Sequence, residues 1–491
     1  MKKTSVTLGN DALRLTASKV ITMIISMISA MLLSRFRTLG EYGTYSQLLI
    51  IVSIATSLIM LGLPNSINYF LAGADSPFER DKFLSVYYTL STFLSFVIGF
   101  VLVLSVPLLE SYFDNENIRS FIYFFALYPW ARIIASSIEN ILVVYRRTRL
   151  LVYFRITNSV SLLLIIFVVQ IFGLTFNSYI LMFLLVEIVF GLSVYFIVNS
   201  ISGGIKLSFD INLIKKVITF SIPIGLASVV GTLNYNLDQL MVGKFYNTEQ
   251  LAIYANAGRE LPITIVTTSI VAVLLPVIVR LIKKQEYKIA LKLWGNSIIL
   301  SYVVICFFAV GFFAFAPDVM NLLYSEKYLP GVPIFRVYSL VLLLRCTYFG
   351  IVLNASGKSQ FIFYSSIASL FMNVLLNYLL YLTIGIIGPA IATLLSQLVI
   401  NLIQLAYTAK ATKVTFSNVF PWKSIGLLTL LNIVLGIAFY YLKGILTIDL
   451  SLGSIGESVF LGLLWGVVYF LVVKNEVVLN WKLLNNGGNY Q

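Results

Sequence analysis

Long runs of hydrophobic residues, separated by short polar connections, recur along the whole chain. Each run holds roughly 20 to 30 residues, which as a helix is long enough to cross a hydrocarbon core of ~30 Å. A transmembrane β-barrel would instead show segments of about 10 residues with alternating polarity. The pattern therefore predicts an all-α polytopic membrane protein with about fourteen transmembrane helices. The expected helices cover residues 14–36, 44–72, 83–107, 118–143, 150–172, 177–199, 213–241, 249–281, 288–316, 332–354, 360–382, 385–409, 422–443 and 454–474.

The composition strengthens this interpretation and narrows the chemistry. Mean hydropathy is +0.94, and 11% of the residues are charged, against about 25% in a soluble domain. The chain has no histidine, which removes the commonest general base and the commonest metal ligand. Cys306 and Cys346 both fall within apolar runs, where we interpret them as packing residues. We expect a protein that is not an enzyme and that holds no metal and no cofactor.

The formal net charge of +14 is explained by membrane topology rather than by nucleic-acid binding. When the connections between the runs are taken alternately, one side of the membrane carries 24 of the 34 lysines and arginines. Because positive charge is retained on the cytoplasmic side, this asymmetry predicts an even number of spans. It places both termini in the cytoplasm. We expect membrane lipids as partners, and no nucleic acid.

Short sequence similarities at an offset of about 210 residues indicate an internal duplication. Arg35 and Tyr45 correspond to Lys244 and Tyr254 at an offset of 209 residues, and proline recurs at positions 64 and 276. Six helices is an even number, so both halves would enter the membrane in the same direction, as in transporters with parallel repeats. The expected organisation is a six-helix lobe in residues 1–205, a second in residues 206–412, and two extra helices with a cytoplasmic tail in residues 413–491.

Two motifs near the N-terminus carry a family resemblance. They are LSRFRTLGEYGTY at residues 33–45 and LGLPNSI at residues 61–67. Over about residues 10–410 the chain resembles the multidrug/oligosaccharidyl-lipid/polysaccharide exporter superfamily, and within it the polysaccharide-unit flippases that act on undecaprenyl-diphosphate oligosaccharides. The motifs are more specific for the superfamily than for the cargo.

The resemblance implies a flippase of the cytoplasmic membrane that moves isoprenoid-diphosphate-linked oligosaccharide units by alternating access for surface polysaccharide assembly. It implies a lipid-linked glycan as substrate, other polysaccharide-assembly proteins as partners, and a monomer. A cation-coupled multidrug exporter of the same fold and a peptidoglycan-precursor flippase remain alternatives. A membrane glycosyl-transferring enzyme is disfavoured because no connection is long enough for an active-site loop. No complete phosphate-loop motif is present, so we expect transport without ATP.

Four arginines in or at the ends of apolar runs are the candidate substrate-binding residues. Charge at membrane depth is costly unless it faces a wet cavity or a partner, and arginine binds phosphate through a planar, permanently charged fork. Pairing with a carboxylate, or extension of the side chain toward the interface, is the structural alternative. The candidates are Arg132 and Arg345, each about halfway along an expected helix, together with Arg259 and Arg35.

Acids and prolines in the runs supply the remaining candidates. A carboxylate in a span can carry a proton or a cation, or can serve as the partner of an arginine. The acids are Glu139, Glu187, Asp238 and Glu260. Proline inside a membrane helix kinks it and frees a carbonyl group, so Pro64, Pro223 and Pro276 are candidate hinges for alternating access or ordinary helix kinks.

Overall fold

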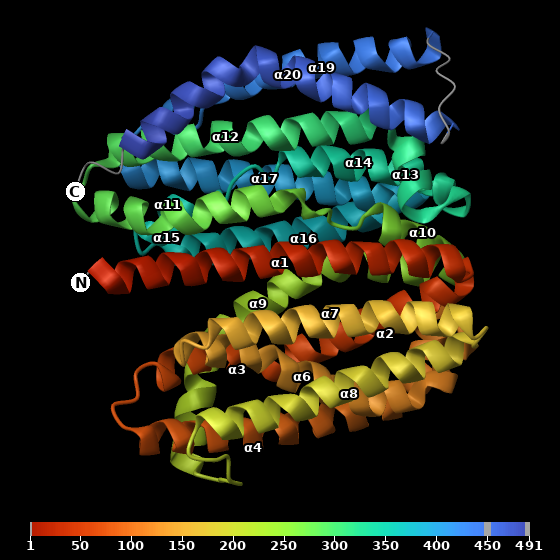
Figure 1. Ribbon diagram of the computed structural model, residues 1–491, viewed down its shortest axis with the longest axis vertical. Coiled ribbons are helices and arrows are strands. Elements are labelled where there is room, and N and C mark those ends of the chain that lie inside the picture. Colours follow the sequence, from red (N-terminus) through yellow and green to blue (C-terminus); the bar gives the residue numbers. More distant parts are fainter. Residues whose placement is uncertain (1, 446–452, 487–491) are drawn as a thin grey trace. The chain divides into compact units, whose positions relative to one another are not determined.

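The computed structural model describes residues 2–445 and 453–486, and every regular element in these ranges is a helix (Figure 1). Twelve stretches of the described chain are long and apolar enough to cross a membrane. One of them, Ser359–Thr412, contains two helices, and the interrupted segment from Val332 to Ala355 lies outside the twelve. The protein is thus an all-α, multi-pass membrane protein. A total of fourteen spans is compatible with these elements and stays a prediction.

The chain forms two compact units, which divide between Ala255 and Asn256. The elements that begin in the first unit are α1 (Lys2–Phe36), α2 (Leu39–Met60), α3 (Leu63–Ser66), the π-helix η1 (Ile67–Leu71), α4 (Pro77–Leu104), α5 (Val106–Phe113), η2 (Glu116–Phe121), α6 (Ile122–Val144), α7 (Thr148–Ile171), α8 (Phe176–Ile201), α9 (Ile211–Phe245) and α10 (Thr248–Ala257). The second unit holds η3 (Pro262–Thr264), α11 (Ile265–Lys283), α12 (Tyr287–Ala314), α13 (Ala316–Tyr324), η4 (Glu326–Gly331), α14 (Val332–Leu343), α15 (Ile351–Ala355), α16 (Ser359–Ile384), η5 (Gly385–Ile387), α17 (Gly388–Thr412), α18 (Phe416–Val419), α19 (Trp422–Ile445) and α20 (Gly453–Asn486).

The internal repeat that the sequence predicts is visible in the order and length of the elements. Helices α9, α12 and α13 begin 209 or 210 residues after α1, α4 and α5, respectively. The later pairs, α6 with α14, α7 with α16 and α8 with α17, keep offsets of 210 to 212 residues. Helices α19 and α20 have no counterpart in this scheme. The duplication therefore extends through six helices, as expected, and the C-terminal pair is an addition to it.

Helix α9 packs within the first unit, although the repeat relates it to α1. A β-carbon on Gly225 of α9 would overlap the backbone of Leu61, and one on Gly62 would lie 2.6 Å from the Gly225 nitrogen. Leu61 and Gly62 both have positive φ and separate α2 from α3. Glycine on both sides therefore allows the backbone of this turn to touch α9. The expected lobe boundary near residue 205 stays a prediction.

The connection between α8 and α9 lies along α4. The backbone N–H groups of Gly203, Lys206 and Ser208 donate to the side chains of Asp81, Ser85 and Thr89, which follow one another at one-turn intervals on α4. Lys82 Nζ also lies 2.6 Å from the Asp210 carboxylate. The hydrogen bond from the Lys82 ammonium group lowers the pKa of the Asp210 carboxyl below its usual range. The connection is therefore held in place without regular structure of its own.

The two C-terminal helices pack on α12 through aromatic side chains (Figure 1). Trp465 of α20 is fully buried and stacks on Phe439 of α19, with 6.0 Å between ring centroids. At one end of this pair Lys443 and Ser458 both contact the Asp318 carboxylate of α13. Helix α20 continues twelve residues past the expected end at 474, so most of the expected tail is helical. Residues 487–491 of that tail lie outside the described residues.

Three expected helices are interrupted, which corrects the uniform spans drawn from the sequence. The span at 44–72 breaks after Met60, the span at 249–281 breaks between Ala257 and Pro262, and the span at 332–354 breaks between Leu343 and Ile351. Hydropathy did not reveal the breaks because the mean over each whole run stays apolar, although Arg259, Glu260 and Arg345 fall in two of the breaks. An interrupted helix leaves backbone polar groups that other side chains must satisfy at membrane depth.

Candidate functional site

The break between α14 and α15 is held open by side chains from three other helices. Three consecutive carbonyl groups past the end of α14 accept hydrogen bonds: Leu344 from Asn401 of α17, Arg345 from Thr267 of α11, and Cys346 from Ser301 of α12. These bonds are 2.6 to 3.1 Å long. Each replaces a helical hydrogen bond that the interruption removes. The break is therefore a satisfied and fixed feature of the second unit.

Arg345 stands inside this break rather than halfway along a continuous helix, as the sequence suggested. Its Nη1 lies 3.1 Å from Oε1 of Glu260, which stands in the second break, between α10 and η3. Thr264 also donates to Glu260 Oε1, at 3.0 Å. Pro262 is the first residue of η3, a position where its missing N–H costs nothing. The two interrupted helices thus meet through one ion pair.

The ion pair borders two cavities of the second unit. The larger, of about 540 Å³, is lined by Glu260 and Arg345, by threonines of α11, and by amide side chains of α17. The polar members of this lining are Thr264, Thr267, Thr268, Thr347, Gln397, Asn401 and Gln404. A smaller cavity of about 40 Å³ is lined by Arg259 as well as by Glu260 and Arg345. The structure therefore brings two of the four predicted arginines and one predicted acid to the same place.

The exposure of the pair is intermediate, with 30% of the Arg345 side chain and 35% of the Glu260 side chain accessible. A pair at this depth is neither sealed in a dry core nor fully solvated. Solvent screening therefore keeps the contribution of the pair to stability small. An ion pair of this kind is suited to partner exchange, because a competing anion can reach the guanidinium.

Arg132, the third predicted arginine, lies in the first unit on α6. Its Nη2 is 3.4 Å from Ser53 Oγ of α2. Within the described chain, no carboxylate lies within ion-pair distance of its guanidinium. Glu187 of α8 is buried and accepts a hydrogen bond from Asn158 of α7 at 3.4 Å. Arg132 therefore keeps its hydrogen-bonding capacity largely available on a half-buried surface.

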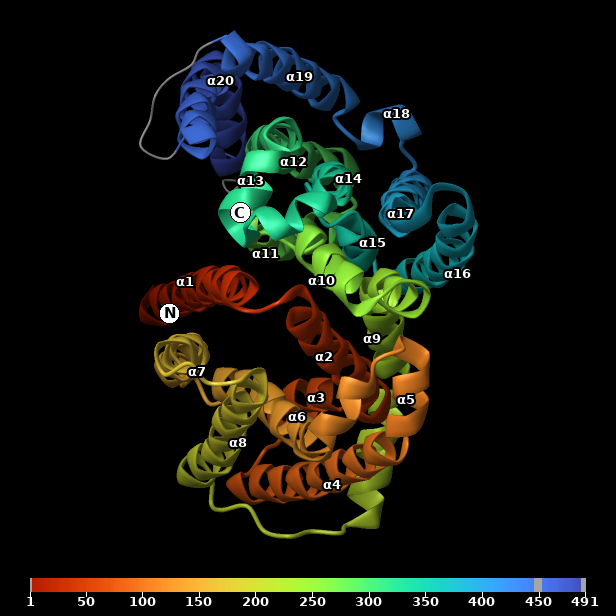
Figure 2. The ribbon, with the colours of Figure 1, turned by 90° about the vertical axis from the view of Figure 1, so that its right-hand side faces the viewer.

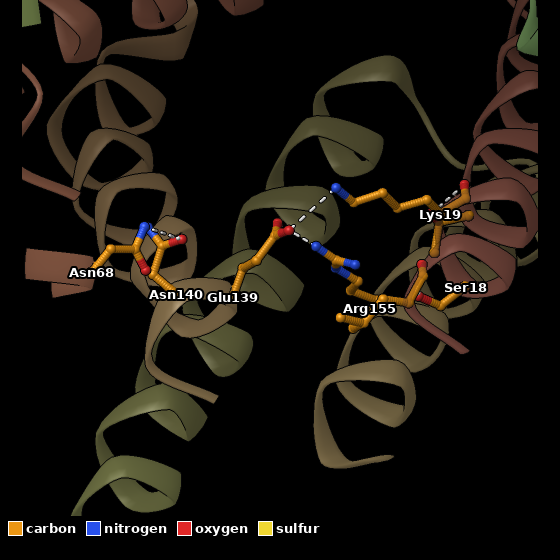
Figure 3. Close-up of polar contacts among 8 residues, drawn as sticks. Ser18, Lys19, Asn68, Glu139, Asn140 and Arg155 are labelled. Atoms are coloured by element: carbon orange, nitrogen blue, oxygen red, sulfur yellow. Dashed lines mark hydrogen bonds and ion pairs between the residues drawn. The ribbon is translucent and has the colours of Figure 1, made fainter. Parts of the chain in front are cut away.

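Glu139 shares a face of α6 with Arg132 but pairs with other residues (Figure 3). Its carboxylate binds Lys19 of α1 at 3.3 Å and also binds Arg155 of α7. The next residue, Asn140, donates to the Pro64 carbonyl at 2.9 Å. Glu139 therefore links α1 and α7 to α6, as a charge partner of residues that the sequence analysis did not connect with it.

None of the remaining predicted residues lines the two cavities beside the Glu260–Arg345 pair. Arg35 is in the last turn of α1 and is exposed. Asp238 is buried in α9 and accepts a hydrogen bond from Tyr254 at 3.3 Å. Pro64 is in α3, directly after the break at Leu61 and Gly62. Pro223 and Pro276 lie inside α9 and α11, respectively.

Sequence reasoning missed the residues that support the break. Thr267, Ser301 and Asn401 are single polar residues in apolar runs, and similar residues elsewhere bond to their own helix, as Thr268 does to Ile265. Trp294 Nε1 donates to Thr347 within the same region, at 2.9 Å. The one available signal was Arg345 itself, a charge in the middle of a run. Its partner could be identified only in three dimensions.

The fold is that of a multi-pass helical membrane protein. A family model described as "Polysaccharide biosynthesis protein" matches residues 32–333, more than half of the chain. The chain belongs to this family of polysaccharide biosynthesis proteins, and with it to the polysaccharide flippases of the superfamily that the motifs indicated.

Individual relatives are distant. An uncharacterized membrane protein of Methanocaldococcus jannaschii is 25% identical over 67% of this chain and 69% of its own length. A probable flippase of low-salt glycan biosynthesis from Haloferax volcanii is 20% identical over 48% of this chain, and the match spans 49% of that protein. Among solved structures, the lipid II flippase MurJ in an inward closed conformation superimposes with a TM-score of 0.77 at 16% identity. That match covers 94% of this chain and 99% of the other, and it shows a shared fold.

Proposed function

We propose that this protein is a flippase of the cytoplasmic membrane that moves an isoprenoid-diphosphate-linked oligosaccharide from the inner to the outer leaflet. The observation that carries the proposal is the Arg345–Glu260 pair, which joins two interrupted helices beside a cavity lined in part by polar side chains. Membership of a polysaccharide biosynthesis family supports a glycan as cargo. The relative from Haloferax volcanii, a probable glycan biosynthesis flippase, points the same way.

The first step is exchange of the partner of Arg345. Arg259, Arg345 and Glu260 border one small cavity and carry a net charge of one positive unit. The diphosphate of the cargo bears about two negative charges and offers oxygens that match the guanidinium fork. It displaces the Glu260 carboxylate from Arg345 and gains a second contact with Arg259. When no cargo is bound, the Glu260 carboxylate is the anion that balances the positive charge of the arginines at membrane depth.

The second step places the glycan in the larger cavity. Threonine hydroxyls of α11 and the amides of Gln397 and Gln404 offer donors and acceptors to sugar hydroxyls. The isoprenoid chain remains in the bilayer, where its apolar surface costs nothing to expose. This division of the cargo is consistent with a cavity whose lining is largely apolar but carries several threonine and amide side chains.

The third step is the change of access. Interrupted helices at the site provide points at which the second unit can bend without breaking helical hydrogen bonds, because the carbonyls of the break bond to side chains of other helices instead. Arg132 of the first unit is a further residue that we propose for cargo binding, because its hydrogen bond to Ser53 is long, at 3.4 Å, and leaves guanidinium donors for an anion. Both termini remain in the cytoplasm throughout.

Reconstitution tests the proposal. Purified protein in liposomes receives a fluorescent isoprenoid-diphosphate disaccharide, and the fraction exposed outside is measured with a membrane-impermeant quencher. We expect transfer without ATP, at a rate at least tenfold above that of protein-free liposomes. Transfer that occurs only with ATP would contradict the mechanism. Efflux of an organic cation with no transfer of the disaccharide would replace the proposed cargo with that of a drug exporter.

A further inference from the structure

A second binding site lies at one end of α12 in the second unit, away from the ion pair. It is a cavity of about 380 Å³ between the first turns of α12 and the connection from α17 to α19, which contains α18 (Figure 2). Lys288 and Lys292 of α12 line it, together with Asn296 and Asn418. It shares no lining residue with the cavity beside Arg345. Neither the family nor the proposed transport reaction assigns it a role.

The polar part of this cavity is cationic. Lys288 and Lys292 are four residues apart, so both project from the same face of α12. Both side chains are exposed, and no carboxylate is among the residues that line the cavity. In the part of the chain that the structure describes, neither lysine has an ion-pair partner. The cavity therefore presents two positive charges to an anion.

The remainder of the cavity is lined by apolar side chains that are largely buried. Leu291, Ile299, Val419 and Phe420 line it, each with less than 9% of its surface accessible. A small soluble anion bound by the lysines would not fill the space between these side chains. A molecule with an anionic head and a hydrocarbon chain would satisfy both parts, since burial of apolar surface contributes about 25 cal/mol per Å².

Aromatic residues around α18 place the cavity at the depth of the lipid headgroups. Phe416 and Trp422 are 41% and 40% exposed, and their rings lie 5.7 Å apart. Trp422 also contacts Phe420, with 4.7 Å between centroids. Partly exposed aromatic rings at the ends of transmembrane helices are typical of the membrane–water interface. Basic pockets between helices at this level are known to suit anionic lipid headgroups.

We propose that this cavity binds one anionic phospholipid. Lys288 and Lys292 contact the headgroup phosphate, and one acyl chain lies on Leu291, Ile299 and Phe420. The lipid thereby fills the space between α12 and the α17–α19 connection. Because the lipid lies near the start of α19, it holds the C-terminal pair of helices to the rest of the second unit.

Native mass spectrometry of the purified full-length protein with added phosphatidylglycerol tests the charge requirement. The double variant Lys288→Gln/Lys292→Gln should bind the first lipid about thirtyfold more weakly, since each lysine near the surface contributes ~1 kcal/mol. The matched control is Lys215→Gln/Lys216→Gln, which removes two exposed lysines at the start of α9, outside any lining named here. Equal losses in the two double variants would reduce the effect to general surface charge and overturn the proposal.

A second variant tests the cavity while keeping both lysines. Gly295 lines it, and a β-carbon there would meet no atom within 4 Å. Gly295→Leu should fill the space and weaken phosphatidylglycerol binding at least tenfold, whereas Gly426→Leu on α19, which is also in open space, should not. Unchanged binding in Gly295→Leu would overturn the proposal. Displacement of the lipid by millimolar inorganic phosphate would show a site for a soluble anion and would overturn it too.

Discussion

Glu260 and Arg345 form a 3.1 Å ion pair although each stands in an interruption of a different helix. The pair joins the two least regular stretches of the second unit, and the carbonyl of the same Arg345 accepts a hydrogen bond from Thr267. The backbone of Arg345 is thus held by Thr267, whereas its side chain is held by Glu260, so the two contacts are independent. An anion that takes the place of Glu260 need not disturb the backbone of the break.

Replacement of Arg345 should stop transport while leaving the fold intact. Arg345→Ala removes the charge and the fork, so we expect at least a tenfold loss of glycan transfer in liposomes. Arg345→Lys should recover part of it because charge survives without bidentate geometry. Arg336→Ala is the control: this exposed arginine on α14 bonds to the Phe313 carbonyl and lies outside the larger cavity. Full transfer by Arg345→Ala at normal abundance would make the arginine structural.

Glu260→Gln should bind the cargo more tightly and release it more slowly. The substitution removes the anion that competes for Arg345 but keeps the size of the side chain and its acceptor for Thr264. Binding of the lipid-linked disaccharide, measured by microscale thermophoresis, should strengthen by about three- to tenfold, with a lower transfer rate. Thr264→Val is the control for loss of the hydrogen bond alone. Weaker binding in Glu260→Gln would show that the carboxylate contributes to the site.

Arg132→Ala should reduce transfer even though the side chain lies in the other unit. Its hydrogen bond to Ser53 is long at 3.4 Å, and it also hydrogen-bonds to Tyr128, so the loss of these contacts costs about 1 kcal/mol or less. We expect an unchanged melting temperature and at least a fivefold slower transfer, with partial recovery in Arg132→Lys. Ser53→Ala serves as the control and should transfer normally. A variant that fails to reach the membrane would indicate a role in folding instead.

The side chains that satisfy the broken α14–α15 segment should matter for stability. Asn401→Leu and Thr267→Val each leave a carbonyl without its donor, which costs about 1–3 kcal/mol for a buried group. Thermal unfolding in detergent should show this loss. Thr268→Val is the matched control, because Thr268 is exposed and bonds within its own helix. Equal stability of Thr267→Val and Thr268→Val would mean that water replaces the missing donor.

Gly225→Ala should be disruptive where Gly231→Ala on the same helix is not. A β-carbon at 225 would overlap the Leu61 backbone, whereas one at 231 meets no atom within 4 Å. We expect Gly225→Ala to destabilise by about 1–3 kcal/mol through overpacking. Gly231→Ala should be neutral or stabilising by about 0.5–1 kcal/mol. Melting temperatures of the two variants side by side decide the matter, and equal values would show that α9 can shift away from the turn.

The sequence by itself determined the class of protein, because burial in a bilayer requires long apolar helices and leaves few places for charge. The 210-residue duplication was also readable, since the lengths of equivalent elements were kept while most residues changed. The same reasoning marked Arg345, Arg259 and Glu260 individually as unusual. It assigned Glu260 no partner on another helix. It placed Glu139 on the same helix face as Arg132, whereas Lys19 and Arg155 bind Glu139 in the structure.

Only the tertiary structure decided where the helices break and which charges meet. The break after Leu343 contains no proline, and Arg345 alone marks it locally, because it is stabilised by Thr267, Ser301 and Asn401, which are distant in sequence. Hydropathy measures the average cost of placing a segment in lipid, and this average is unchanged when another helix supplies the missing hydrogen bonds. The ion pair between two such breaks depends on how the helices pack together. The sequence of one helix alone does not specify that packing.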